Sequence, residues 1–343
     1  SMEESDISAS PESPKCEEEE IKTNGFLVKF VGTHQIPDSF LHKLLFVVLF
    51  PVQVFMILRA CYVRETYKDA LYNFLNLYSK DVKRSTSVII GSVQRPLKFV
   101  FISDTHNKHK SFGDLPEGDV LVHTGAFSNW GTLAEVTNFV AWFSSMPHKT
   151  KILVPGNHDM IMDEAYYNCY YKDWTPDGIK RSTKEAYDLF RKHGITVLLD
   201  ESTTVEGVKI YGTPWVRQYG MFLQIVAVFR DSLRHFLASW QTAFNRKEKD
   251  ILQYWEKLQP ADILLTHQPP KGFGDRSGSS VPLGCEHLLH KVQKVVKPKL
   301  HVFGHEHLDV GIFETESTTF VNAASVDNFY EIREPIVVEV VPN

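Results

Sequence analysis

The chain has 343 residues, of which 43% are hydrophobic and 23% are charged, and its formal net charge is -5. This composition is ordinary for a protein with a sizeable hydrophobic core, and the acidic balance argues against a broad nucleic-acid-binding surface. The four cysteines form no CxxC pair, which argues against a zinc site built from thiolates.

The N-terminal region is expected to differ from the rest of the chain. Residues 1–24 are rich in Ser, Glu and Pro and include four consecutive glutamates at 17–20. Such a segment buries too little apolar surface to offset the entropy lost on ordering, so we predict an acidic disordered tail. Residues 25–96 form a hydrophobic, mainly helical segment in our interpretation, in which 85–97 is a connection.

The most hydrophobic run is Leu44 to Leu58, which Pro51 and Gln53 interrupt. A helix that spans a membrane needs roughly 20 apolar residues, and this run has 15. Together with the amphipathic pattern that follows it, the run predicts a pair of core or interface helices. The alternative is a hairpin that inserts into or rests on a membrane. Because the four cysteines are far apart and suit a reducing compartment, we expect a cytoplasmic protein, with membrane association through this run as the alternative.

From residue 97 onward, short apolar runs alternate with helical patterns. The apolar runs predict strands at 98–103, 119–124, 151–154, 196–199, 208–211, 262–267, 299–303, 318–322 and 336–341. Capping-box spacing at Thr132–Glu135 and Ser182–Glu185 predicts two helix starts, and a third helix is expected over 286–296. Strands that alternate with helices indicate a layered α/β fold.

One segment interrupts this alternation. Between 219 and 244, apolar residues recur at helical spacing over more than six turns, which predicts a long amphipathic helix within an insertion at about 219–258. This helix either packs on the core or serves as a lid, a dimer contact or a membrane-facing surface.

Groups typical of metal sites follow four of the predicted strands. They are Asp104 and His106, then Asn157 and His158, then His267, then His305 and His307, whereas the second strand in the series leads through Gly125 to Ala126. Oxygen and imidazole ligands without thiolate suit Mn, Fe, Zn or Co. Two such ions about 3.5–4 Å apart can activate water and neutralise a phosphoryl group. A carboxylate would have to bridge them, and position 126 offers only a methyl group.

In their order, these motifs resemble the calcineurin-like metallophosphoesterase superfamily, whose pattern is D-x-H, G-D, G-N-H-[DE], H and G-H-x-H. This sequence has Asp104-Thr-His106, Gly125-Ala126, Gly156-Asn-His-Asp159, His267 and Gly304-His-Glu-His307. The stretches 103–106, 123–125, 210–215, 266–270 and 298–304 resemble the MPPED (239AB) phosphodiesterase branch. The resemblance covers about 97–341 and implies a four-layer αββα sandwich, preceded here by an extra N-terminal helical segment.

The resemblance also implies roles for individual residues. Asp104, His106 and His307 would hold a first divalent metal, and Asn157, His267 and His305 a second. The nucleophile would be metal-bound hydroxide, His158 would contact the phosphate and act as general acid, and Asp159 would orient His158. The branch further implies a small-molecule phosphodiester as substrate, such as a cyclic nucleotide, with manganese among the expected metals.

Ala126 departs from the family pattern, because it stands where the family has the bridging Asp. We therefore predict weaker metal occupancy and severely reduced hydrolysis. A deliberate substitution explains this departure, and we favour it because the six other ligands and His158 persist. The alternatives are a natural non-catalytic protein that binds a nucleotide or phosphate, and a membrane-associated scaffold or homodimer that uses Leu44–Leu58 and the 219–244 helix.

Overall fold

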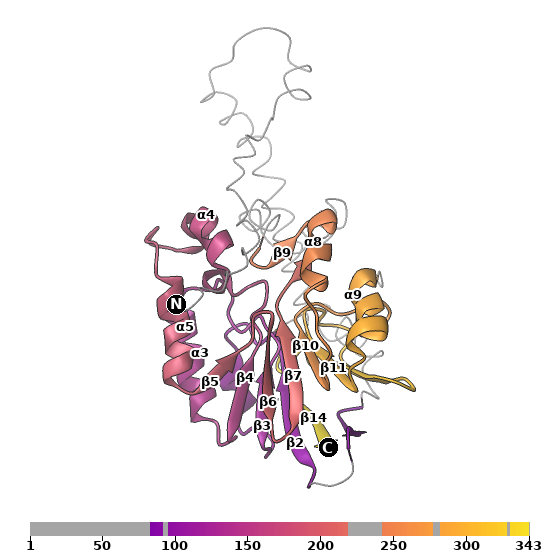
Figure 1. Ribbon diagram of the computed structural model, residues 1–343. Coiled ribbons are helices and arrows are strands. Elements are labelled where there is room, and N and C mark those ends of the chain that lie inside the picture. The colour runs from indigo at the N-terminus through magenta and orange to yellow at the C-terminus, as the bar shows by residue number, and fades with distance from the viewer. Residues whose placement is uncertain (1–82, 92–94, 219–241, 277–281, 328–329, 343) are drawn as a thin grey trace, which may run out of the picture. The chain divides into compact units, whose positions relative to one another are not determined.

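The computed structural model describes residues 83–91, 95–218, 242–276, 282–327 and 330–342 (Figure 1). The chain divides into two units, Ser1–Tyr72 and Asn73–Asn343, and every described residue belongs to the second. The predicted acidic tail, the apolar run Leu44–Leu58 and residues 219–241 of the predicted long helix lie outside the described residues. No described helix combines the length and the hydrophobicity needed to cross a bilayer.

Two six-stranded sheets form the centre of this unit. The first has the order β1-β14-β2-β3-β4-β5. Its strands are β1 (Ser85–Ile89), β2 (Leu97–Ile102), β3 (Val120–His123), β4 (Thr150–Leu153), β5 (Ile195–Val197) and β14 (Ile336–Val341). Strands β2 to β5 are parallel, whereas β14 runs antiparallel to β2 and pairs on its other side with β1.

The second sheet has the order β12-β13-β11-β10-β7-β6. Its strands are β6 (Glu201–Val205), β7 (Val208–Thr213), β10 (Ile263–Thr266), β11 (Leu300–Phe303), β12 (Gly311–Glu314) and β13 (Thr319–Asn322). The four central strands are parallel and the two outer ones antiparallel. A separate parallel pair joins β8 (Val216–Arg217) to β9 (Asn245–Arg246).

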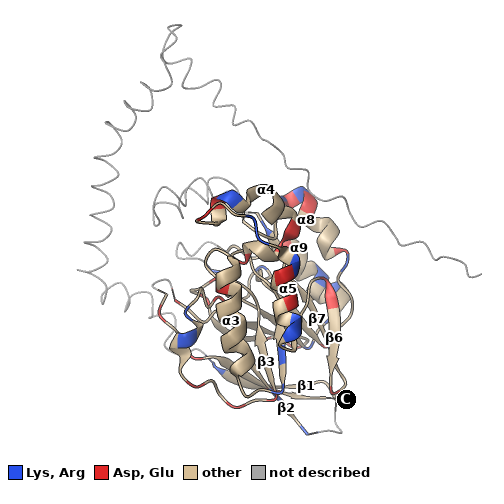
Figure 2. Cartoon of the chain, turned by 90° about the vertical axis from the view of Figure 1, so that its left-hand side faces the viewer, with Lys and Arg blue, Asp and Glu red and all other residues tan. Residues whose placement is uncertain are grey.

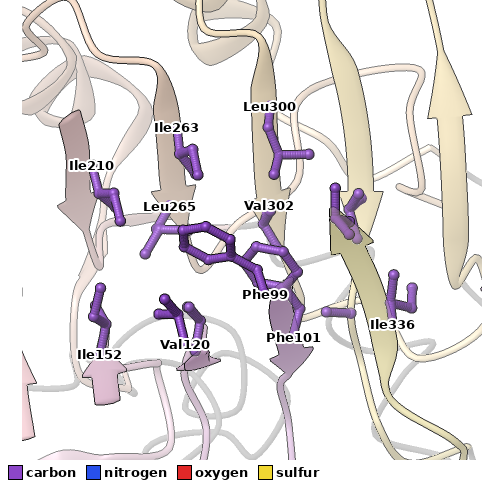
Figure 3. Close-up of a cluster of buried hydrophobic side chains, with 14 of the residues drawn as sticks. Phe99, Phe101, Val120, Ile152, Ile210, Ile263, Leu265, Leu300, Val302 and Ile336 are labelled. Carbon is purple, nitrogen blue, oxygen red and sulfur yellow. The ribbon is translucent and has the colours of Figure 1, made fainter. Parts of the chain in front are cut away.

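Apolar side chains fill the space between the two sheets. Phe99 and Phe101 of β2 are fully buried there, and their rings stack with centroids 5.8 Å apart. Figure 3 shows them facing Ile263, Leu265 and Val302 of the second sheet. Burying one such side chain contributes about 1.5–3 kcal/mol. Parallel strands covered on both faces need nearly continuous apolar runs, which is why these strands were predictable from the sequence.

Helices cover the outer face of each sheet (Figure 1). Those on the first sheet are α3 (Leu133–Ser145), α4 (Glu164–Trp174) and α5 (Thr183–Lys192), with the short 3-10 turns η1 (His109–Phe112) and η2 (Met160–Met162). Those on the second are α8 (Glu248–Trp255) and α9 (Glu286–Lys291), which continues into the π-helical turn η3 (Val292–Val296). The predicted αββα sandwich is therefore confirmed.

Both predicted capping boxes mark real helix starts. The Thr132 hydroxyl accepts a hydrogen bond from the Glu135 amide, and the Glu135 carboxylate accepts one from the Thr132 amide. Ser182 caps α5 through the same kind of bond from the Glu185 amide to its hydroxyl. The solvent-facing side of α5 has charges of both signs (Figure 2), including the ion pairs of Asp188 with Lys184 and Arg191.

Two predictions about the domain boundaries are wrong. Ser85–Ile89, expected to be a connection in a helical segment, forms β1 and pairs in parallel with β14. This strand lies at the edge of the sheet and only Val88 in it is buried, so its sequence lacks a strong apolar signal. The helical period also does not extend to Phe244, which has a φ of +59° and precedes β9. Ala243 and Phe244 are apolar because they pack in the core beneath the first sheet's helices.

Candidate metal centre

The predicted ligands meet where the two sheets end. Loops at the carboxyl ends of β2 and β4 bring Asp104, His106 and Asn157 from the first sheet, and loops after β10 and β11 bring His267, His305 and His307 from the second. The carboxyl ends of parallel strands are the usual location of ligand sites in α/β folds. The six side chains therefore gather at one edge of the sandwich, after the strands that the sequence predicted.

The backbone of these loops is unusual. Asp104, His106, Ala126 and His305 all have positive φ, between 40° and 71°. Left-handed backbone is uncommon outside glycine and tends to cluster at functional sites, where the surroundings fix it. Here the amide of Asp104 donates to the Gly125 carbonyl and that of His106 donates to the Ala126 carbonyl, at 2.8 and 3.1 Å. These bonds tie the loop after β2 to the loop after β3.

Asp104, His106 and His307 form a compact triad whose potential ligand atoms all lie within 4.8 Å of one another. The Nε2 atoms of His106 and His307 are 3.3 Å apart, and Asp104 Oδ1 lies 3.6 Å from His307 Nε2. Two nitrogens that share one ion at about 2.1 Å are about 3.0–3.4 Å apart, so this spacing fits a divalent metal. One carboxylate and two imidazoles are also a donor set suited to such ions.

Electrostatics keep these groups in the forms that bind metal. Burial raises the pKa of Asp104, but its interactions with His307 and the neighbouring imidazoles outweigh this effect and hold the pKa below its usual range. Burial also lowers the pKa values of His106, His267 and His305. Metal ligation requires an ionised carboxylate and neutral imidazoles, and this environment favours both.

A second group of ligands lies beside the triad. The Nδ1–H of His267 donates to the Thr124 carbonyl at 2.8 Å, which leaves Nε2 of the neutral ring as an acceptor. That atom lies 2.8 Å from Oδ1 of Asn157, another acceptor, and the His305 ring is 5.0 Å from that of His267. Because two lone pairs facing each other need a cation or a proton between them, the arrangement fits a second cation site. His267 Nε2 is also 4.0 Å from Asp104 Oδ1.

Two glycines allow the loops to approach this closely. A Cβ atom at Gly304 would lie 2.1 Å from Asp104 Oδ2, the atom that accepts a hydrogen bond from the His305 amide. A Cβ atom at Gly156 would lie 2.2 Å from the Ala126 nitrogen. The glycines in G-N-H and G-H-x-H are therefore needed for backbone packing around the centre.

His158 lies next to the triad, with its ring 4.6 Å from that of His106. Its Nδ1–H donates to the Asn129 carbonyl at 3.0 Å. Nε2 is therefore the ring nitrogen that does not take part in this bond. Burial lowers the pKa of His158, and the Asn129 carbonyl partly opposes that effect. The imidazole is therefore held in one tautomer and orientation by a main-chain oxygen.

Asp159 has a different position from the one we expected. Its carboxylate accepts hydrogen bonds from the amides of Ala126, Gly156 and Ser128 and from the Ser128 hydroxyl, at 2.7–3.1 Å. Asn129 rather than Asp159 thus holds the His158 ring. Asp159 instead joins the loop after β3 to the loop after β4, a role that its position in the motif did not reveal.

Sequence reasoning also missed the residue that fixes the Asn129 loop. Glu135, recognised only as a helix cap, accepts hydrogen bonds from the amides of Asn129, Trp130 and Thr132. It also accepts one from the Asn107 side chain, directly after His106. The capping-box signal located Glu135 correctly but gave no indication of its contact with Asn107.

Comparisons with known proteins agree with this geometry. Residues 97–309 match the family described as calcineurin-like phosphoesterase. A UPF0046 protein of Caenorhabditis elegans is 34% identical over 72% of this chain and 82% of its own length. The human protein named metallophosphoesterase domain-containing protein 1 is 32% identical over 71% of this chain and 70% of its own length.

Solved structures show a weaker likeness. The phosphopantetheinyl hydrolase of Mycobacterium tuberculosis aligns over 73% of this chain and 98% of its own, with 13% identity and a TM-score of 0.47.

Proposed function

Because the chain belongs to the calcineurin-like phosphoesterase family, we propose that it binds small phosphodiesters, cyclic nucleotides among them, at a divalent metal centre and hydrolyses them slowly. The observation that supports this proposal most strongly is the triad of Asp104, His106 and His307, whose ligand atoms gather within 4.8 Å. Membership of the family supports phosphoester chemistry at this site, and we propose the ligand class, the metal and the slow rate.

A divalent ion held by the triad would polarise a phosphoryl oxygen and make a water molecule more acidic. The oxygen and nitrogen donors suit Mn, Fe, Zn or Co, and manganese is the ion that we propose among these. Asn157, His267 and His305 would hold a second ion less firmly. His158, fixed by the Asn129 carbonyl, is placed to contact the phosphoryl group and to give a proton to the leaving oxygen. Burial lowers the pKa of His158, and the negative charge of a bound phosphate would oppose that effect.

Ala126 limits this chemistry. It is fully buried in the loop that Asp159 ties to Gly156, and its side chain has no atom that can bind a metal. Two dications close together repel each other, and a bridging carboxylate would offset that repulsion while binding both. Without it, we expect tight binding at the triad, weak binding at the second group and slow hydrolysis.

The backbone supports this interpretation of position 126. Its φ of +54° is a conformation that Asp and Asn adopt more readily than Ala, which has no polar side chain to form a local hydrogen bond. An aspartate can therefore occupy the position without added backbone strain. The lack of a carboxylate at position 126 favours a second candidate function, in which this chain binds a nucleotide and does not turn it over.

Hydrolysis of bis(p-nitrophenyl) phosphate in Mn²⁺ tests the proposal. We expect Ala126→Asp to raise the rate at least about 10-fold, because a bridging carboxylate would restore the second ion. Ala126→Asn, which matches it in size and backbone preference but lacks the charge, should raise the rate far less. His158→Asn in the Ala126→Asp background should remove most of the gain. If Ala126→Asp remains as slow as Ala126→Asn, the bridging role of position 126 is wrong. If no variant hydrolyses the substrate above the rate without protein, hydrolysis is excluded and the binding function is favoured.

A further inference from the structure

A cleft of about 880 Å³ is lined in part by Tyr330, whose ring contacts two histidines of the metal triad. Its lining includes Lys108 and Phe112 from the segment after β2 and Tyr330 from the segment before β14, and it extends to Arg84 and Val337 at the edge of the first sheet. This volume is within the range of small-molecule sites.

Tyr330 lines the cleft and also contacts the candidate metal centre. The Tyr330 ring centroid lies 5.3 Å from that of His106 and 6.1 Å from that of His307. Lys108, which also lines the cleft, is two residues beyond His106 in the chain. Arg333, another lining residue, donates a hydrogen bond to the His307 carbonyl. A group attached to a phosphate at the triad would therefore have this cleft next to it.

The local backbone fixes Tyr330 in an unusual conformation. Its φ is +60°, which is rare for a bulky residue. The Tyr330 amide donates to the Asp327 carbonyl at 3.0 Å, the Asp327 amide donates to the Glu331 carbonyl, and the Glu331 amide donates to the Asp327 carboxylate. Backbone strain of this kind persists when neighbouring contacts over-determine it, and here it places an aromatic ring beside two metal ligands.

The chemistry of the walls indicates the class of ligand. Tyr330 and Phe112 offer aromatic surface, and Leu115, Ile332 and Val337 add apolar surface. Charged residues of both signs surround it: Arg84, Lys108, Arg333, Asp114, Glu331 and Glu334. An acyl chain would displace water from these charged groups without offering them hydrogen bonds, whereas a nucleoside combines a ring that stacks with polar edges that form hydrogen bonds.

We infer that this cleft binds the nucleoside half of a nucleotide whose phosphate lies at the metal triad, with Tyr330 as the aromatic wall that contacts the base. The inference rests on the proposed function, because it uses the same phosphate site. It makes Tyr330 a specificity-determining residue, one that distinguishes a nucleotide from a sugar phosphate.

The test compares two ligands that differ by the base. The full chain, loaded with Mn²⁺, is titrated calorimetrically with 5′-AMP and with ribose 5-phosphate. We expect AMP to bind about 10-fold more tightly, since stacking on an aromatic side chain contributes to binding on this order. Tyr330→Phe, which retains the ring, should keep the preference, and Tyr330→Ala should abolish it by weakening AMP binding far more than ribose 5-phosphate binding.

A second variant probes another part of the lining. Ser111 is exposed and lines the cleft, so Ser111→Trp should fill the cleft and abolish the preference for AMP. Lys110→Trp is the matched control, because Lys110 is exposed on the same 3-10 turn and should leave the preference unchanged.

Three results would overturn the inference. The first is equal affinity for the two ligands in the unchanged chain. The second is a preference for AMP that survives Tyr330→Ala or Ser111→Trp. The third is an equal loss of affinity for both ligands in Tyr330→Ala, which would mean that the ring supports the metal centre and not the base. Failure of the unchanged chain to bind either ligand would instead contradict the proposed function itself, and the inference with it.

Discussion

The Nε2 atoms of His106 and His307 lie 3.3 Å apart, although 201 positions separate the two residues in the chain. One follows β2 in the first sheet and the other follows β11 in the second. Packing of the two sheets against the core around Phe99 and Phe101 sets this distance. The metal centre is thus a product of the sandwich as a whole, and its properties should respond to changes in both the ligands and the core.

Removal of either histidine should disrupt the triad. His307→Ala leaves one carboxylate and one imidazole, so we expect Mn²⁺ affinity to fall at least about 100-fold. Isothermal titration measures this directly. His290→Ala is the control, because His290 lies on the surface at the last turn of α9 and should leave the affinity unchanged. Equal affinities in the two variants would show that the triad does not bind the ion.

Asp159 should be essential for stability. Replacement by Ala would leave three buried amides and the Ser128 hydroxyl without their acceptor, which should lower the free energy of unfolding by about 3 kcal/mol or more. Denaturant unfolding without metal measures the effect. Asp188→Asn, which removes exposed ion pairs on α5, should lower the free energy of unfolding far less. An unchanged denaturation midpoint in Asp159→Ala would contradict the conclusion that this carboxylate joins the loops after β3 and β4.

The inter-sheet core should tolerate truncation poorly. Phe101 is fully buried between the sheets, so Phe101→Ala should lower the free energy of unfolding by about 3–5 kcal/mol. Thermal or denaturant unfolding gives the value. Ile89→Ala is the comparison, because Ile89 is 70% exposed at the end of the edge strand β1, and we expect a change within about 0.5 kcal/mol.

Stability should fall in acid partly through buried His301. Burial lowers its pKa to about 3, and its Nε2 lies 2.9 Å from the Thr266 hydroxyl. Below a pH of roughly 6.5, the unfolded chain binds a proton at this position and the folded chain does not, so the stability contribution declines by up to about 1.4 kcal/mol per pH unit. The decline should continue until the folded pKa is reached.

The variant His301→Gln isolates this effect. Its loss of unfolding free energy between a pH of about 7.5 and a pH of about 5 should be smaller than that of the unchanged chain by about 2 kcal/mol. His290→Gln, at a surface position on α9, should show the full loss. Identical pH profiles for His301→Gln and the unchanged chain would contradict this assignment.

The fold was largely predictable because its central strands are covered on both faces. Runs such as Val120–His123 and Leu300–Phe303 are buried throughout, and burial on both faces requires a continuous apolar sequence. Edge strands such as β1 and β12 contact the core on one side only and have no comparable pattern. For a related reason, buried Phe244 was wrongly assigned to a helix, since apolar spacing does not distinguish helical burial from burial in a turn.

The candidate site was predictable at the level of motifs and not at the level of supporting contacts. The ligands follow strong strands, so their clustering could be inferred. The carbonyls of Asn129 and Thr124, which orient His158 and His267, are main-chain groups and leave no mark in the sequence. The Tyr330 ring lies beside His106 because of the turn between Asp327 and Glu331, more than 200 residues further along the chain, and no local sequence pattern indicates this contact.

The most direct test of the account is the number of Mn²⁺ ions that each chain binds, measured by equilibrium dialysis with metal analysis. We predict one tightly bound ion for the unchanged chain, held by the triad, and two for Ala126→Asp, with Ala126→Asn resembling the unchanged chain. Two tightly bound ions in the unchanged chain, or no increase in Ala126→Asp, would contradict the claim that the missing carboxylate at position 126 limits this centre.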